Sequence, residues 1–341
     1  MAAEGASRAA PRIWLWLTVA LTVAAFILAV ALAPPASASP GRGLGWVLFV
    51  GSSAHVASTG WLYTLRDVRW HAASRPLRLL WAPAALVLAG AGAAAVLSPR
   101  VVTWLLLPFF GWQFCHFQKQ NLGLAAIAAR SAGLASLRTA ERRAIVAAGV
   151  AGVGGLMARP ALLQLPVTSP LAALFPVSAL GFGLAVAAGL TLLSLRPPQQ
   201  RPPGFCVVYV TALCFFLPVF VFASPYAAVG GMTIAHGLQY LLLVGLVAAG
   251  GRRGAGRAVR VAAFCNVALV GGVILEATSH LHGAALAGRI LFGGYLGVVM
   301  AHFVIDAALW RLRDPFPRAF MARYVPFLVP ASRQPMDRQP I

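Results

Sequence analysis

The chain has 341 residues, of which 60% are hydrophobic and only 10% charged, and its mean hydropathy is +0.81. A soluble domain is about half apolar and about a quarter charged, so an aqueous core cannot bury this much apolar surface. The net charge of +20 comes from arginines in short gaps between apolar runs, and this pattern excludes nucleic acid as the expected partner. The composition predicts a polytopic α-helical membrane protein whose solvent is the lipid bilayer.

Ten apolar stretches follow one another along the chain, and most approach the roughly 20 residues that cross a hydrocarbon core. They cover residues 13–33, 45–63, 79–97, 101–125, 144–157, 171–195, 205–222, 226–249, 259–277 and 289–310. The stretch 144–157 is short and rich in glycine. The first stretch has the alternative of a cleaved signal, because Ala-Ser-Ala-Ser-Pro follows at 36–40, but its length favours a retained anchor.

The distribution of arginine predicts the orientation of this all-α bundle. With a cytoplasmic N-terminus, 22 of the 26 arginines fall in cytoplasmic segments, and the outer segments hold only Arg42, Arg100, Arg159 and Arg289. We therefore expect both termini in the cytoplasm and the protein in the inner membrane of a bacterium. Residues 1–310 form one predicted transmembrane domain, and the basic, Pro-rich tail 311–341 is expected to lie along the cytoplasmic surface.

Four histidines lie inside apolar stretches, each on a different predicted span. They are His55, His116, His236 and His302, which come 10, 15, 10 and 13 residues after the starts of their spans. All four spans run from outside to inside, so at ~1.5 Å per residue the histidines share a slab about 8 Å thick near the midplane. Ionisable groups at this depth often mark function. The structural alternative is that each histidine is an interhelical hydrogen-bond partner.

A polar side chain follows each of these histidines by one helical turn. Ser58 and Thr59 follow His55, Gln120 follows His116, Gln239 and Tyr240 follow His236, and Asp306 follows His302. Residues three or four apart share a helix face, so these groups are predicted to orient or supplement the imidazoles. A buried aspartate must be paired, metal-bound or protonated. Lys119 or a metal would supply the charge for Asp306, and pairing with Arg311 or Arg313 is the alternative.

Four histidines with one carboxylate suit Fe(II), and zinc, copper and manganese are the alternative metals. Zinc more often uses fewer histidines together with an activated water. Haem is less favoured, because cytochrome-b-like bundles carry two histidines on one helix and each of these spans carries one. The pattern therefore predicts a non-haem metal site.

At these residues the chain resembles the Brp/Blh family, membrane β-carotene 15,15'-dioxygenases of bacteria. The matching pieces are His55 with Gly60, His116-Phe117, His236-Gly237, and His302 through Asp306 to Trp310-Arg311. The chain departs from the family pattern where it has Ala-His-Val in place of Pro-His-Gly, and where Gln239-Tyr240 stands in place of a second histidine. The resemblance implies a shared metal–histidine framework, and carotene as the substrate does not carry over with it.

The expected function is that of a membrane-embedded metal oxygenase or oxidase acting on a lipophilic small molecule, a carotenoid or isoprenoid being the substrate class that the resemblance implies. The four histidines are the predicted ligands, and Asp306, Lys119, Tyr240, Gln120 and Gln239 the predicted catalytic surroundings. A transporter or an ion or proton pathway is an alternative function, suggested by Gly230-Gly231 and Pro218. A haem-binding electron-transfer subunit is another. The oligomeric state is left open.

Aromatic residues cluster before and around His116 on its span. They are Phe109, Phe110, Trp112, Phe114 and Phe117. We expect them to line a tunnel from the bilayer or to pack in the core.

Overall fold

The computed structural model describes residues 2–35, 39–134, 136–168, 170–250, 255–283 and 285–329, and every regular element in these ranges is a helix. The α-helices are α1 (Ala2–Ala31), α2 (Arg42–Phe49), α3 (His55–Leu62), α4 (Arg66–Ser74), α5 (Ala82–Val96), α6 (Pro99–Ser131), α7 (Thr139–Ala158), α8 (Leu174–Ser194), α9 (Pro203–Leu213), α10 (Leu217–Val221), α11 (Gly231–Ala249), α12 (Ala255–Ser279), α13 (Leu286–Leu309) and α14 (Pro315–Tyr324). Short π-helical turns are η1 (Val50–Ala54), η2 (Leu77–Trp81) and η5 (Tyr226–Gly230), and short 3₁₀ turns are η3 (Pro160–Leu163), η4 (Pro198–Gln200) and η6 (Leu281–Gly283).

The predicted all-α fold is confirmed in the described residues, and six of the helices are long and apolar enough to cross a membrane. They cover Ala10–Ala31, Leu77–Val96, Leu174–Ser194, Tyr226–Ala249, Gly256–Gly283 and Leu286–Leu309. Each coincides with one of the ten predicted stretches. Large apolar side chains such as Leu180 on α8 and Ile274 on α12 are exposed along these helices, as lipid contact requires.

The other four predicted stretches differ from these six in continuity or polarity. The stretch 45–63 is divided into α2, η1 and α3, and 205–222 is divided into α9 and α10. The stretch 101–125 lies within α6, a helix of 33 residues that carries Lys119 and several polar groups, and 144–157 lies within the 20-residue α7. Two of the four histidine-bearing stretches therefore belong to this less apolar group.

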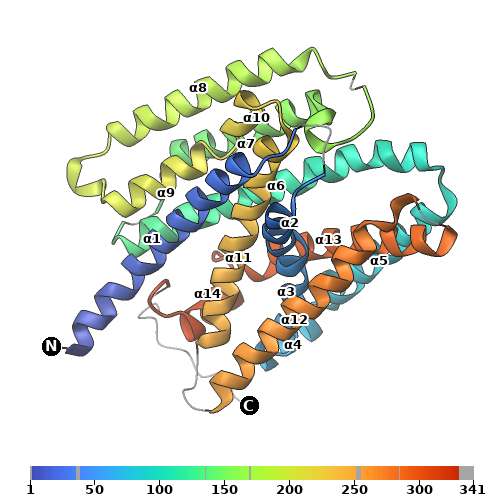
Figure 1. The fold of residues 1–341 in the computed structure, drawn as a ribbon. Helices are drawn as coiled ribbons and strands as arrows, with labels where there is room; N and C mark the ends of the chain where they lie inside the picture. Colours follow the sequence, from blue (N-terminus) through green and yellow to red (C-terminus); the bar gives the residue numbers. More distant parts are fainter. Residues whose placement is uncertain are drawn as a thin grey trace.

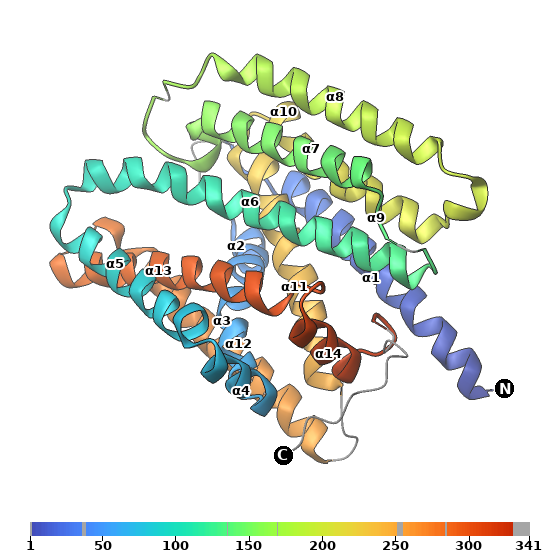
Figure 2. The ribbon, with the colours of Figure 1, turned by 180° about the vertical axis from the view of Figure 1, so that it is seen from behind.

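Helix α11 lies between two groups of helices (Figures 1 and 2). Helices α7, α8, α9 and α10 form one group, and α3, α5, α12 and α13 form the other. The closest-packed pairs are α5 with α13, α7 with α8, and α1 with α11. On α5 and α13, Gly90 and Gly293 let the two backbones touch, because a Cβ on either glycine would overlap the other's carbonyl oxygen.

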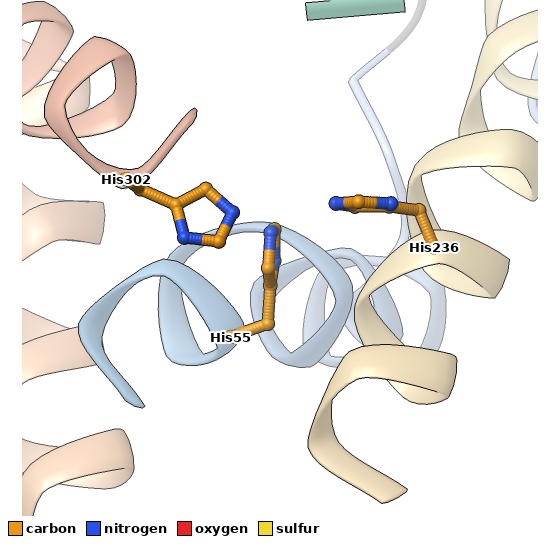
Figure 3. Close-up of side chains that lie close together, drawn as sticks. All are labelled: His55, His236 and His302. Carbon is orange, nitrogen blue, oxygen red and sulfur yellow. The ribbon is translucent and has the colours of Figure 1, made fainter. Parts of the chain in front are cut away.

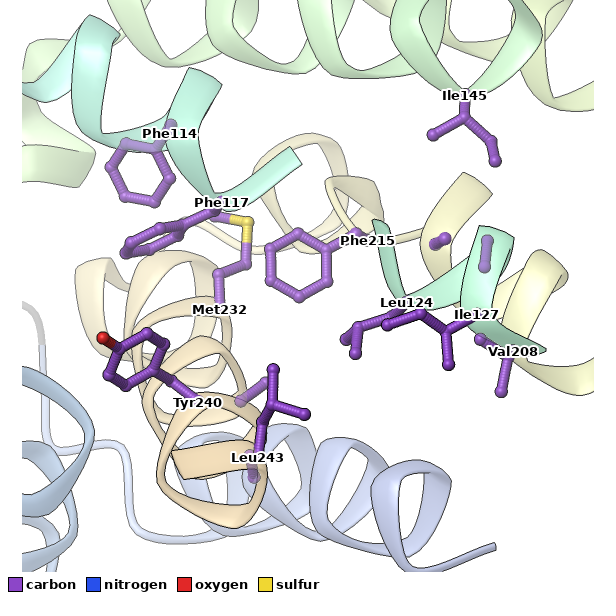
Figure 4. Packing of buried hydrophobic residues seen from close by; sticks show 14 of the residues in the cluster. Phe114, Phe117, Leu124, Ile127, Ile145, Val208, Phe215, Met232, Tyr240 and Leu243 are labelled. Atoms are coloured by element: carbon purple, nitrogen blue, oxygen red, sulfur yellow. The ribbon is translucent and has the colours of Figure 1, made fainter. Parts of the chain in front are cut away.

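The central position of α11 makes it the most buried of the six apolar helices. Figure 4 shows its side chains Met232, Tyr240 and Leu243 beside Phe117 of α6 and Phe215, which lies between α9 and α10. This cluster packs the interior face of α6 against α11. The helices that carry the polar groups are thus the ones that the apolar core fixes most firmly.

The segment 311–329 of the predicted tail folds back on the bundle. Within it, α14 packs against α11 and α13, and Phe320 and Met321 are buried. Residues 330–341, and the 36–38 part of the possible signal-cleavage sequence, lie outside the described residues.

Candidate metal centre

Each of the four predicted ligand histidines lies on its own helix, and all four are buried. His55 is the first residue of α3, His116 lies in α6, His236 in α11 and His302 in α13, with exposures between 1% and 7%. The π-helical turn η1 ends directly before His55, and η5 directly precedes α11. Such turns are frequent at functional sites, because the extra residue re-aims the side chains that follow.

The helices that carry His55 and His236 approach closely because two glycines meet there. A Cβ on Gly237 would overlap the carbonyl oxygen of Gly51, and a Cβ on Gly51 would overlap the backbone of Ile234. The backbones therefore touch one residue after His236 and four residues before His55. Two histidines far apart in the sequence are brought side by side by this crossing.

The four imidazoles form a compact quadrilateral. The ring centroids of His55 and His236, and of His236 and His116, are 5.0 Å apart; those of His116 and His302, and of His302 and His55, are 5.1 Å apart. The His236 and His302 centroids are separated by 6.5 Å across the middle. Figure 3 shows the rings of His236 and His302 reaching towards the His55 ring from opposite sides. The four predicted ligand histidines, which come from four different helices, thus lie together in the fold.

The Nε2 atoms of all four histidines are buried and have no hydrogen-bond partner among the described residues. A buried polar atom without a partner costs roughly 1–3 kcal/mol, so four together are unusual in a native core. Nitrogen ligand atoms of His55, His236 and His302 lie within 4.8 Å of one another, and so do the ligand atoms of His116, His302 and Asp306. The two groups have His302 in common.

A directed chain of hydrogen bonds fixes the tautomer of His302. Tyr240 donates its hydroxyl hydrogen to Oδ1 of Asp306 at 2.9 Å, so the Thr59 hydroxyl, 2.8 Å away, must donate to Tyr240. With that hydrogen used, the 2.7 Å contact between Thr59 Oγ1 and His302 Nδ1 requires the imidazole to donate. The hydrogen of His302 therefore sits on Nδ1, and the lone pair of Nε2 faces the other histidines. Metal-binding histidines are commonly oriented in this way.

Asp306 lies beside the histidine cluster, on the side nearest α14. Its Oδ2 lies 3.5 Å from Nε2 of His302 and 3.7 Å from Nε2 of His116, and Trp310 donates its indole hydrogen to Oδ1 at 3.2 Å. Among the described residues Asp306 forms no ion pair with Arg311 or Arg313. The predicted alternative of a boundary ion pair is therefore not formed within the described chain.

Two of the other predicted residues, Gln239 and Gln120, form a hydrogen-bonded chain that begins at α1. Gln239 donates to Thr22 on α1 at 2.8 Å, and Gln120 donates to the Gln239 side-chain oxygen at 2.9 Å and to the His236 carbonyl oxygen at 3.0 Å. These amides brace α1, α6 and α11 behind the histidines and do not reach the rings. Lys119 is exposed on α6 and makes no hydrogen bond or ion pair with the described residues.

Aromatic rings cover the cluster on two sides. Phe117 stacks on His236 with centroids 4.0 Å apart, and Phe303 stacks on His116 at 4.6 Å. Phe114 and Phe117 belong to the main core, whereas Phe109 and Trp112 pack against a separate apolar cluster of Val56, Val299 and Phe303. Of the predicted tunnel residues, two are thus core residues and two adjoin an apolar region beside the site. Phe110 packs on the main core.

Two residues at the site were not among the predicted catalytic surroundings. Thr59 was recognised only as a polar neighbour of His55, and Trp310 was seen only as part of the end of the last span. Thr59 follows His55 by four residues, and Trp310 follows Asp306 by four, so helical spacing was the available signal. The remaining histidines lie elsewhere: His71 stacks on Phe316 near α14, and His282 contacts Phe292 in a different part of the fold.

Comparisons with known proteins add no relative: no family model matches the chain, and no curated protein or solved structure matches it.

Proposed function

We propose that this chain is a membrane-embedded, metal-dependent oxygenase that acts on a lipid-soluble substrate, with the metal held by His55, His116, His236 and His302. The observation that supports the proposal is the meeting of four buried imidazoles whose Nε2 atoms have no hydrogen-bond partner among the described residues. A metal ion supplies what such atoms need, because neutral imidazole nitrogens are ligands and a shared ion satisfies all of them at once.

Fe(II) is the metal that fits this donor set best. Imidazole with one carboxylate suits iron, manganese and zinc, and the absence of cysteine or methionine donors among the described cluster residues argues against Cu(I). Asp306 supplies one negative charge near the histidines, either as a ligand or through its hydrogen bonds. Bound Fe(II) would supply the capacity to bind and activate dioxygen.

The chain's own residues prepare the site for that chemistry. The Thr59–Tyr240–Asp306 chain holds His302 in one tautomer, and Trp310 holds Asp306. Phe117 and Phe303 exclude water from the rings of His236 and His116. A dioxygenase that converts one carbon–carbon double bond and one O2 into two carbonyl groups balances atoms and electrons without a reductant. The resemblance to the Brp/Blh family favours this reaction class.

The proposed topology has ten crossings, with both termini in the cytoplasm of a bacterium and the protein in its inner membrane. The six apolar helices support the membrane location, and the excess of arginine in alternate loops supports the orientation. The interrupted segment α2–η1–α3 and the polar helix α6 would cross within the bundle, where other helices cover their polar groups.

The experiment is metal analysis of the purified full-length chain together with its visible absorption spectrum. We expect about one iron per chain with no Soret band. A Soret band would assign the site to haem, and protein that folds, melts normally and holds no metal after incubation with Fe(II), Zn(II) or Mn(II) would contradict the proposal. A metal-free protein that moves ions or protons across liposomes would favour the transporter.

A further inference from the structure

A second site lies outside the histidine cluster, between the short helices α4 and α14. These helices flank an open surface pocket of about 470 Å³. Its lining consists of Asp67, Trp70, His71, Ser74, Phe316, Ala319, Phe320 and Arg323. The size is in the range of small-molecule sites, and the lining combines aromatic walls with a few polar groups.

The pocket lies at the level where two apolar helices end. Helix α4 is followed within three residues by the apolar segment Leu77–Val96, and α14 begins six residues after the apolar segment Leu286–Leu309 ends. Figure 2 shows α4 and α14 at the end of the bundle where α12 begins. Trp70 and Trp81 are each 67% exposed here, and exposed tryptophans are typical of the boundary between lipid and water. The pocket therefore opens at headgroup height.

Several hydrogen-bond donors in the pocket lining are unused, whereas the Asp67 carboxylate already accepts hydrogen bonds. Arg323 donates hydrogen bonds from one nitrogen, Nη1, to both carboxylate oxygens of Asp67, at 3.0 and 2.8 Å. Tyr324 donates its hydroxyl hydrogen to the same carboxylate at 3.3 Å. The Nε and Nη2 donors of Arg323 have no acceptor among the described residues, nor do the ring nitrogens of His71. The Ser74 hydroxyl donates its hydrogen to the backbone carbonyl oxygen of His71. The pocket lining can therefore donate hydrogen bonds to a ligand that carries acceptor atoms.

Positive charge surrounds the pocket. The two segments that build it, 66–78 and 311–324, contain eight arginines and two aspartates, and both aspartates are paired with arginine. Burial lowers the pKa of His71, and the charges of Arg75 and Arg78 lower it further, whereas the charge of Asp314 acts in the opposite direction. An anion fits the charge, the donors and the aromatic walls together.

We infer that this pocket binds the headgroup of an anionic membrane phospholipid, with the phosphodiester beside Arg323 and His71 and the start of the acyl chains along Trp70 and Phe316. The level of the pocket at the membrane boundary favours a lipid over a soluble phosphate. Aromatic walls suit the glycerol and acyl portion, which a free phosphate lacks. The inference stands independently of the metal centre.

The test uses full-length protein reconstituted in nanodiscs of equal phosphatidylglycerol and phosphatidylcholine, then extracted in mild detergent. Retained lipid is counted by mass spectrometry. We expect phosphatidylglycerol to be enriched about tenfold, as one or two charge-assisted contacts would give. The double variant Asp67→Asn/Arg323→Gln should lose the enrichment. It keeps the net charge and leaves no unpaired ion, so a general electrostatic effect cannot produce that loss.

A second variant, Ala319→Trp, fills the pocket and leaves every charge in place, and it should also lose the enrichment. Arg100→Gln, which removes an exposed arginine from the start of α6, is the control and should retain it. Melting curves identify any variant that fails to fold. Equal retention of the two lipids by the unmodified protein would overturn the inference, as would enrichment that survives in both folded pocket variants. Displacement of the lipid by excess inorganic phosphate would assign the pocket to a soluble phosphate instead.

Discussion

Two sets of buried polar side chains lie in the same bundle and differ in how their hydrogen bonds are satisfied. Glu141 on α7 and Arg196 after α8 are 0% and 3% exposed, and two 2.5 Å hydrogen bonds join them. Glu141 also accepts from the backbone of Arg138. The histidine cluster is as deeply buried, yet six of its ring nitrogens have no hydrogen-bond partner among the described residues. Folding alone completes the hydrogen bonds of the first set, whereas those of the second set stay incomplete within the described residues.

The difference separates structural from functional polar groups by a physical criterion rather than by residue type. A buried ion pair with complete hydrogen bonds holds helices in register, and its loss leaves an uncompensated charge. Converging lone pairs have an energetic cost that a bound ion removes. The predictions below test whether the two sets respond to mutation in these opposite ways.

The largest effect is expected at the ion pair. Glu141→Ala leaves Arg196 buried and uncompensated, so the free energy of unfolding should fall by about 3–5 kcal/mol. Asp314→Ala is the matched control, because it removes a carboxylate that contacts Arg313 at 4.0 Å on the surface and should cost about 0–1 kcal/mol. Denaturant unfolding followed by tryptophan fluorescence gives both values. Equal effects would refute a special role for the buried pair.

The helix crossing beside the histidines should be the next most sensitive point. Gly237→Ala introduces a Cβ that overlaps the Gly51 backbone, so α11 must shift, at a cost of about 1–3 kcal/mol and with weaker metal binding. Gly60→Ala on α3 is the control, since its added Cβ meets only a Val267 methyl at 3.9 Å. Melting temperature and metal content are the measurements. A stable, fully metallated Gly237→Ala variant would show that the close approach does not position the histidines.

The hydrogen-bonded chain from His302 should affect metal binding more than folding. Thr59→Val removes the acceptor for His302 Nδ1, and the loss of such an orienting partner lowers metal affinity about 10–100-fold. Thr59→Ser keeps the hydroxyl and should restore most of the affinity. Competitive chelator titration measures the difference. If Val and Ser variants bind metal equally well, the tautomer of His302 is not controlled by Thr59.

The smallest change in the free energy of unfolding is expected when a cluster histidine is replaced and no metal is bound. His236→Leu removes two buried nitrogens without hydrogen-bond partners, so the metal-free variant should be as stable as the metal-free parent, within about 1 kcal/mol, or more stable. The parent alone should be stabilised by added metal. Unfolding curves with and without metal test both statements. Strong destabilisation of the metal-free variant would mean that His236 is a structural hydrogen-bond partner like Glu141.

Sequence patterns predicted the four histidines and the polar groups one helical turn after them, because these follow from helical periodicity; the common depth of the histidines stays a prediction. They did not give the direction in which Gln239 points, because the rotation of α11 is determined by its contact with α1 and by the Gly51–Gly237 crossing. The hydrogen bond between Thr59 and His302 joins residues that are 243 positions apart in the sequence, and it depends on the packing of α3 against α13. The pocket between α4 and α14 requires the tail to fold back, which no local pattern indicated.

The hydrophobic pattern likewise predicted six apolar helices well and described the segments around His55 and His116 less well. The first is divided into α2, η1 and α3 and the second carries several polar groups, so apolar length alone cannot define them.

X-ray absorption spectroscopy at the edge of the bound metal tests the central claim most directly. We expect a first coordination shell made mainly of imidazole nitrogens, with the multiple-scattering signature of several histidines, and loss of that signature in His302→Ala. A shell of sulfur ligands, a porphyrin signature, or an unchanged spectrum in His302→Ala would contradict it.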